Sequence, residues 1–256
     1  MKLSMKEFDA MQMGWRKWYI EKMELKTFKK FGLVIKGLDI LEVGCGNGYA
    51  ASLITAEQPH SYTGLDIMPE QLEIARGRNL PSACFVEGSA DDLSRFPDGS
   101  FDAVLDFCIL HHVEGWRIFF DESRRVLRDG GSIYVADLSK RCIHIVDALL
   151  HWGHAEEALF TLKEFEEEAN RRGFTTVHKT SDLGLEGQRS LRFLPVRFAP
   201  EAKAACVLNR MCSRVFSPPL PGLFAKASGH RAAGRLLRPI LPAENNTAPA
   251  KGRLPH

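Results

Sequence analysis

Two acidic residues and three closely spaced glycines are the first group in this sequence whose types and spacing suit binding chemistry. Glu42 lies in an apolar run, and glycines follow it at positions 44, 46 and 48 in the stretch ILEVGCGNG. Asp66 ends a second apolar run, SYTGLD, about 20 residues further on. A glycine at such a turn lets the backbone approach a ligand closely because it has no Cβ atom. A carboxylate at the end of the second strand suits the hydroxyls of a ribose.

Two kinds of cofactor have a ribose that Asp66 could hold. A dinucleotide is bound by the pattern GxGxxG, in which the glycines face a pyrophosphate, whereas this sequence has GxGxG. Glu42 precedes the turn closely, and its carboxylate would repel a pyrophosphate. The pattern therefore favours a ligand with a positively charged end. An NAD-dependent oxidoreductase remains an alternative.

Four sequence blocks follow one another in this chain: LEVGCGNG, GLDIMPEQLEIAR, VEGSADDLSRFPDGSFDAVLDFCILHHV and ESRRVLRDGGSIYVADL. In this order they resemble the class I S-adenosylmethionine-dependent methyltransferases, and within them the type 11 group that includes enzymes similar to the ubiquinone/menaquinone C-methyltransferases. They cover about residues 38–140, and LKEFEEEANRRGFTTVHKT adds a weaker similarity. The resemblance implies an α/β fold with a Rossmann-like, seven-stranded, mostly parallel sheet, helices on both faces and an N-terminal helical cap.

The resemblance also implies which residues bind S-adenosylmethionine. The glycine turn would admit its methionine and ribose part, and Glu42 would lie near its ammonium group, directly or through water. Asp66 would accept hydrogen bonds from both ribose hydroxyls, and Ile67 would pack on the adenine. The full set of expected cofactor-binding residues is Glu42, Gly44, Cys45, Gly46, Asp66, Ile67, Ser89, Ala90, Asp91 and Phe107.

Two of these positions, Ser89 and Phe107, depart from the family pattern. Ser89 stands where relatives often carry an aspartate that contacts the adenine edge, so Asp91 is a candidate substitute. Ala90 would offer only its backbone NH. Phe107 stands where many relatives carry a small polar residue, so stacking or shape would replace a hydrogen bond there.

The implied activity is methyl transfer to a small-molecule or lipid-like acceptor, with release of S-adenosylhomocysteine. Such a displacement depends mainly on aligning the nucleophile, the methyl carbon and the sulfur, so a catalytic acid or base is not obligatory. If the acceptor must lose a proton, the candidate bases are Asp106, His111 and His112. A histidine has a suitable pKa, near 6.5. The alternative from another class is a regulatory or interaction protein that binds S-adenosylmethionine without turnover.

Apolar runs alternate with helical periodicities along the chain, and these elements must position the residues above. The alternation predicts right-handed crossovers and a mostly parallel sheet. Gly130 and Gly131 are predicted to stop a helix before a strand. The predicted strands are 39–43, 61–66, 83–87, 101–107, 131–137 and 174–180, and the predicted helices are near 48–57, 69–78, 115–127 and 160–172.

Two apolar stripes flank the predicted cofactor core. One includes Met11, Trp15, Trp18 and Tyr19 in an amphipathic N-terminal segment, and the other includes residues 143–152. We interpret the second stripe mainly as core packing, with a substrate-covering lid as the alternative. Together the stripes favour a small or lipid-like apolar substrate.

The sequence divides into a predicted methyltransferase domain and a tail. The domain covers residues 1–212, with a helical cap at 1–37, the cofactor-binding core at 38–140 and a substrate-side lid with C-terminal strands at 141–212. Residues 213–256 are basic and rich in Pro, Gly and Ala, and we expect them to be disordered. A weak contact of this tail with a membrane surface is an alternative to a solvated tail.

Composition narrows the partners and the compartment. The formal net charge of +2 over 256 residues is too small to indicate nucleic acid as the main partner. The sequence has no apolar run of roughly 20 residues and no secretory signal, so we expect a cytoplasmic protein without a transmembrane segment. The six cysteines form no CxxC pair and no histidines have zinc-site spacing, so no metal is expected. The oligomeric state is left open.

Overall fold

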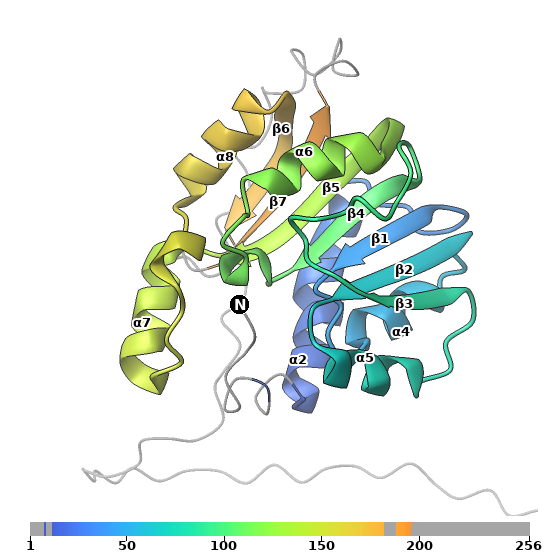
Figure 1. The fold of residues 1–256 in the computed structure, drawn as a ribbon, viewed down its shortest axis with the longest axis horizontal. Helices are drawn as coiled ribbons and strands as arrows, with labels where there is room; N and C mark the ends of the chain where they lie inside the picture. Colours follow the sequence, from blue (N-terminus) through green and yellow to red (C-terminus); the bar gives the residue numbers. More distant parts are fainter. Residues whose placement is uncertain (1–7, 9–11, 182–187, 196–256) are drawn as a thin grey trace, which may run out of the picture. The chain divides into compact units, whose positions relative to one another are not determined.

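A seven-stranded sheet organises the computed structural model, which describes residue 8, residues 12–181 and residues 188–195. The strand order is β3-β2-β1-β4-β5-β7-β6, and the first five strands in this order are parallel to one another. Strand β7 is antiparallel to both β5 and β6 (Figure 1). The predicted α/β class with a mostly parallel sheet is therefore confirmed. The strands are β1 (Asp39–Val43), β2 (Ser61–Asp66), β3 (Ala83–Glu87), β4 (Phe101–Phe107), β5 (Leu127–Leu138), β6 (Phe174–Ser181) and β7 (Gln188–Pro195).

Helices connect the strands and precede the first one. An N-terminal α-helix continues through a π-helical turn into a second α-helix before β1, as the aromatic periodicity predicts. The helical elements are α2 (Gly14–Tyr19), η1 (Ile20–Leu25), α3 (Lys26–Lys30), α4 (Tyr49–Thr55), α5 (Pro69–Arg76), η2 (Leu110–His112), α6 (Ile118–Val126), α7 (Lys140–Leu150), η3 (Glu156–Ala158) and α8 (Leu162–Arg171).

The two faces of the sheet are covered by different helices, because side chains alternate between the faces along each strand. On β1, Leu41 and Val43 join a core under α6 and α8. Ile40 joins a second core under η1, α3, α4 and α5. The helices therefore form one layer on each side of the sheet (Figure 1).

The boundary between α6 and β5 differs from the prediction. Helix α6 ends at Val126 and β5 begins at Leu127, so Gly130 and Gly131 lie inside the strand and do not stop the helix. The register between β4 and β5 shifts between Phe101 and Ala103, beside these glycines. Gly130 has a φ of +83°. Glycine adopts such a positive φ more readily than other residues, and it is therefore suited to an irregularity in the strand.

Helix α8 begins with a reciprocal capping arrangement. The Thr161 hydroxyl accepts a hydrogen bond from the Glu164 backbone NH at 3.2 Å, and the Glu164 carboxylate accepts one from the Thr161 NH at 2.8 Å. We expect Thr161→Ala to lower the free energy of unfolding by about 0.5–2 kcal/mol, because the Glu164 NH loses its acceptor. Urea denaturation measures this change. Thr161→Ser keeps the hydroxyl and serves as the control, and a Ser variant as unstable as the Ala variant would contradict the capping argument.

Some predictions concern residues that the structure does not describe. The tail at 213–256 and Met11 lie outside the described residues. Among the residues that are described, no helix is both long and apolar enough to cross a membrane.

Candidate functional site

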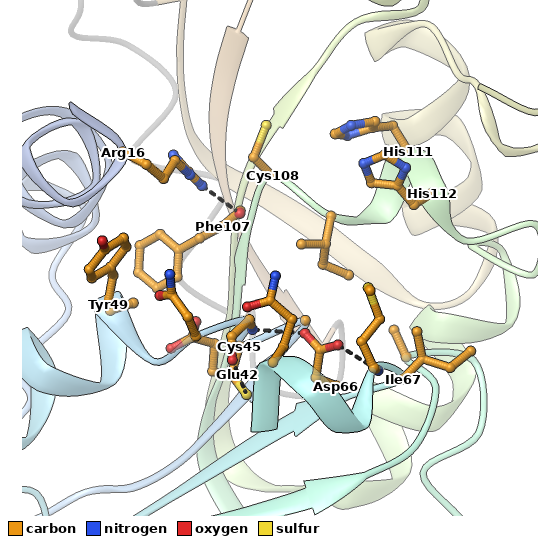
Figure 2. A pocket seen from close by; sticks show the side chains of 18 of the residues that line it. Arg16, Glu42, Cys45, Tyr49, Asp66, Ile67, Phe107, Cys108, His111 and His112 are labelled. Atoms are coloured by element: carbon orange, nitrogen blue, oxygen red, sulfur yellow. Dashed lines mark hydrogen bonds between the residues drawn. The ribbon is translucent and has the colours of Figure 1, made fainter. Parts of the chain in front are cut away.

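A cavity of about 500 Å³ lies at the carboxyl ends of the parallel strands. The loops after β1, β2, β3 and β4 form its floor, and residues of α2 and α7 form its walls. Open α/β sheets bind ligands at this edge, and the volume is that of a small-molecule site. Figure 2 shows that Glu42, Asp66, Phe107 and His112 come from different segments and surround one space.

The glycines of the loop after β1 serve two different purposes. Gly44 has a φ of +66°, and a Cβ on it would lie 2.3 Å from Cγ1 of Ile109, so packing requires glycine there. Gly46 has a φ of +51°, but a Cβ on it would meet open space, with only Oε1 of Gln71 at 4.0 Å. Gly46 also lines the cavity. The loop therefore leaves room for a ligand beside the backbone of Gly46.

Asp66 ties the glycine loop to the end of β2. Its Oδ2 accepts a hydrogen bond from the Gly46 NH at 2.7 Å, and its Oδ1 accepts one from the Met68 NH at 2.9 Å. Burial raises the pKa of Asp66 above its ordinary value. Each carboxylate oxygen has a further lone pair, and Asp66 lines the cavity. The carboxylate is therefore placed to accept hydrogen bonds from ligand hydroxyls.

Glu42 lies on the cavity floor with almost no exposed surface. Tyr62 donates a hydrogen bond to its Oε2 at 2.6 Å. Burial raises the pKa of Glu42 to about 8, against an ordinary value of 4.5. A cation close to this carboxyl would lower its pKa again. Glu42, the open side of Gly46 and Asp66 thus suit a ligand with both a cationic group and hydroxyls, as S-adenosylmethionine has.

The other expected cofactor residues divide into two groups. Cys45, Ile67, Ser89, Ala90 and Phe107 line the cavity together with the glycine loop. Asp91 does not line it. Its carboxylate accepts a hydrogen bond from the Ser89 hydroxyl and packs against the backbone of Gly115. The structure therefore gives no support to Asp91 as a direct substitute for the family's aspartate.

Arg16 is a cavity residue that the sequence did not reveal. Its Nη1 pairs with Oε2 of Glu24 at 2.8 Å, and its Nη2 donates to the Phe107 carbonyl at 2.7 Å (Figure 2). The guanidinium is buried and lines the cavity. It joins α2 to the end of β4. No sequence signal distinguishes Arg16 from the adjacent, exposed Lys17.

A second connection from the N-terminal segment crosses the glycine loop. The Gln12 amide donates to Oε1 of Gln71 at 3.0 Å and accepts a hydrogen bond from the Asn47 amide at 2.7 Å. Gln71 and Asn47 both line the cavity. Amides at unrelated positions have no recognisable spacing, so sequence reasoning missed this group as well.

Asp106 does not face the cavity. Its side chain is completely buried, its Oδ1 accepts a hydrogen bond from the Ile109 NH at 3.0 Å, and it is absent from the cavity wall. Burial and the nearby Asp137 carboxylate raise the pKa of Asp106 well above its ordinary range. The expectation that Asp106 contacts a substrate is therefore corrected: its position supports the loop after β4.

His111 and His112 both line the cavity, on the side away from Glu42. Nδ1 of His111 lies 2.6 Å from Oδ1 of Asp137, and the two imidazole centroids are 4.1 Å apart. His154, which follows α7, completes a group of three rings, with its centroid 4.8 Å from that of His112. The sequence gave no reason to join His154 to the other two, because the contact depends on how α7 folds back.

The apolar stripe of α7 contributes less to the core than expected. Ile143 is buried, as the core interpretation requires, but Leu149 is 72% exposed. Val146, Leu150 and Trp152 line the cavity. The core interpretation is therefore wrong for most of the stripe, which forms an apolar wall opposite the cofactor residues.

Comparisons with known proteins agree with this geometry. A family model described as a methyltransferase domain matches residues 41–135. The chain is 40% identical over 115 residues to a protein of Mycobacterium ulcerans named as a probable phthiotriol/phenolphthiotriol dimycocerosates methyltransferase, which covers 44% of each chain. It is 40% identical over 109 residues to a fatty-acid O-methyltransferase of Mycolicibacterium smegmatis, covering 42% of this chain and 39% of that protein. The matched region thus spans less than half the length of these relatives.

Solved structures show the same fold. An S-adenosylmethionine-dependent methyltransferase from Aquifex aeolicus superimposes with a TM-score of 0.60 at 16% identity, covering 75% of this chain and 98% of that one. One from Mesorhizobium loti gives 0.57 at 18% identity, covering 66% and 96%. Residues 41–135 are a class I methyltransferase domain of type 11, a class whose cofactor is S-adenosylmethionine.

Proposed function

We propose that the protein transfers a methyl group from S-adenosylmethionine to a lipid-like acceptor. One observation carries this proposal: a single cavity joins the loop of Gly46 and Asp66 to the apolar wall formed by Val146, Leu150 and Trp152. The relatives named as phthiotriol dimycocerosates and fatty-acid methyltransferases support an acceptor with long hydrocarbon chains.

The proposed roles of the residues on the cofactor side follow from the chemical groups of S-adenosylmethionine. S-adenosylmethionine supplies an electrophilic methyl group on a sulfonium centre. Asp66 would hold the ribose hydroxyls, Glu42 would face the ammonium group, and Ile67, which is 40% exposed, would pack on the adenine. The backbone near Ser89 and Ala90 would contact the adenine edge.

The acceptor side combines apolar and imidazole groups. The residues of α7 would bind hydrocarbon and exclude water, while His111 and His112 are the polar groups placed to contact an acceptor oxygen. Aligning the reactants in this way can contribute about 7–11 kcal/mol to the barrier reduction. We propose accordingly that the described part of residues 1–37 caps the cofactor, residues 38–140 bind it, and the described part of residues 141–212 faces the acceptor.

A direct assay tests the proposal. The protein is incubated with S-adenosylmethionine and either a long-chain fatty acid, a long-chain diol or short polar analogues of each, and S-adenosylhomocysteine is quantified. We expect product only with the long-chain acceptors, because the α7 wall offers apolar contacts. Asp66→Ala, assayed in parallel, controls for release of product by contaminants.

Each outcome has a defined meaning. Turnover confined to the short polar acceptors would refute the lipid-like substrate while keeping the methyl transfer. Tight binding of the cofactor without turnover on any acceptor would favour the non-catalytic alternative.

A further inference from the structure

Three imidazoles meet beside the acceptor side of the cavity, which two of them, His111 and His112, line. His111 and His112 come from η2, and His154 comes from the segment after α7. One ligand atom from each residue lies within 4.8 Å of those of the other two. His111 and His112 are buried, and the His154 side chain is only 1% exposed. Buried imidazoles in such proximity are costly if they carry charge, because their positive charges repel one another.

The ring positions are close to those in metal sites built from three histidines. With metal–nitrogen distances of about 2.0–2.1 Å, ring centroids are about 4.5 Å apart at right-angled coordination and about 5.2 Å apart at tetrahedral coordination. The observed separations are 4.8 Å for His112–His154 and 5.3 Å for His111–His154. The 4.1 Å separation of His111 and His112 is slightly smaller, so a small rotation of one ring would complete the arrangement.

Carboxylates hold two of the rings in the orientation that a metal ligand needs. Nδ1 of His111 lies 2.6 Å from Oδ1 of Asp137, and Nδ1 of His154 lies 2.6 Å from Oδ1 of Asp147. In metal-binding histidines, the N–H of the nitrogen that does not bind the metal usually donates a hydrogen bond to such a carboxylate. This hydrogen bond fixes the tautomer and raises the basicity of the nitrogen that binds the metal. We propose that His111, His112 and His154 bind one divalent transition-metal ion, such as zinc. The ligand atoms would be Nε2 of His111, Nε2 of His154 and one nitrogen of His112.

A second group in the same region is a weaker candidate. Cys108, His111 and Asp137 also offer ligand atoms within 4.8 Å of one another. Asp137 is already paired with His111. The group of three histidines therefore carries the proposal.

The proposed site goes beyond the proposed methyl transfer. Three protein ligands leave a coordination position open, as in catalytic zinc sites, and His111 and His112 face the cavity. The open position would take an oxygen of the acceptor. An ion in this site would lower the pKa of a bound acceptor hydroxyl, so the hydroxyl would release its proton to bulk water without an imidazole acting as the base.

Metal binding is measured directly on the full chain without a polyhistidine tag. Zinc is titrated into the metal-free protein by calorimetry, and cobalt is titrated in parallel because its visible absorption bands report the coordination geometry. We expect one ion per chain. His154→Ala should abolish saturable binding, and Asp147→Asn should weaken it by about 10- to 100-fold, because the ring loses the partner that orients it.

Two variants serve as matched controls. His60 forms an exposed pair with Asp39, also at 2.6 Å, but belongs to no group of imidazoles among the described residues, so His60→Ala should leave zinc affinity unchanged. Cys108→Ser should likewise leave it unchanged. Cofactor affinity and thermal midpoint are measured for every variant to establish that it is folded, and His112→Ala replaces His154→Ala if the latter does not fold.

The proposal is overturned by any of three results. The first is the absence of stoichiometric zinc binding. The second is equal zinc affinity of His154→Ala and the unaltered chain. The third is loss of zinc binding in Cys108→Ser, which would move the site to the group that contains the thiol.

Discussion

Asp66→Ala is expected to weaken binding of S-adenosylmethionine by about 2–4 kcal/mol, or about 30- to 1,000-fold. The carboxylate lines the cavity at the end of β2, and two charge-assisted hydrogen bonds to ribose hydroxyls contribute about 1.5–3 kcal/mol each before water compensates. The Gly46 NH also loses its acceptor in this variant, so the glycine loop is less well ordered for the ligand. Both effects act in the same direction.

Calorimetric titration with S-adenosylmethionine measures this loss. Asp92→Ala is the matched control, because it removes an exposed carboxylate outside the cavity wall. An Asp66→Ala protein with unaltered affinity would show that the ribose is held elsewhere. The thermal midpoint of the unliganded variant separates weakened binding from general unfolding.

Glu42→Gln is expected to change both cofactor binding and its dependence on pH. The raised pKa of about 8 keeps most of the Glu42 carboxyl protonated at pH 7 in the unliganded protein. Binding of an ammonium group favours the ionised form, so binding should release a proton and become tighter as pH rises towards 8. We expect the Gln variant to bind about 10- to 100-fold more weakly at pH 8. It should also lose the proton release attributable to this residue.

Titrations in buffers with different ionisation enthalpies measure the released proton, and the comparison with Glu42→Gln removes any contribution from the cofactor's own amine. Equal proton release in both proteins would contradict the assignment of Glu42 to the ammonium group.

The same substitution should stabilise the unliganded protein at alkaline pH. The folded-state pKa of Glu42 is above its unfolded value of 4.5, so the folded state retains a proton that the unfolded state releases between pH 4.5 and about 8. Stability of the unaltered protein therefore falls as pH rises through this window. We expect Glu42→Gln and the unaltered protein to have similar thermal midpoints at pH 4.5. At pH 8 the variant should have the higher midpoint, because its free energy of unfolding should exceed that of the unaltered protein by on the order of a few kcal/mol. If Glu42→Gln had a lower thermal midpoint than the unaltered protein at pH 8, the buried carboxyl of Glu42 would not be the cause of the loss of stability between pH 4.5 and 8.

The parts of the fold that were predictable are those with local signals. Strands β1 to β4 begin and end where the sequence predicts, because apolar runs there are bounded by Gly, Asp or polar turns. The start of β5 was misplaced because Gly130 and Gly131 act in a strand irregularity and not as a helix stop. Strand β7 was expected only from the resemblance, since Gln188–Pro195 mixes charged and apolar residues without a distinctive boundary.

The candidate site was predictable to the extent that its residues are close in sequence to a motif. Glu42, Gly46 and Asp66 follow from one pattern, and the structure brings them to one cavity. Arg16 lines the same cavity from a distant segment, and His154 packs against His112 of its wall. Both contacts depend on tertiary packing that no spacing encodes. For Asp106 the position in the sequence was misleading. Its place at a strand end suggested contact with a ligand, but its side chain is buried and does not line the cavity.

The sparse packing of α7 has a consequence for how a long acceptor could enter. Ile143 is the buried residue of this helix, and exposing one such side chain costs roughly 1.5–3 kcal/mol. The ion pair of Lys140 with Glu156 is partly exposed and adds little. The Asp147 carboxylate of α7 lies 2.6 Å from Nδ1 of His154, whose side chain is buried, so His154 would move with the helix. With so few side chains to expose, we expect local detachment of α7 to require less free energy than global unfolding, about 5–15 kcal/mol for a domain. We expect the acceptor wall to open in this way while the loops beside Asp66, held by backbone hydrogen bonds to β2, keep their shape. The free energy needed to admit a bulky hydrocarbon would then be confined to one helix.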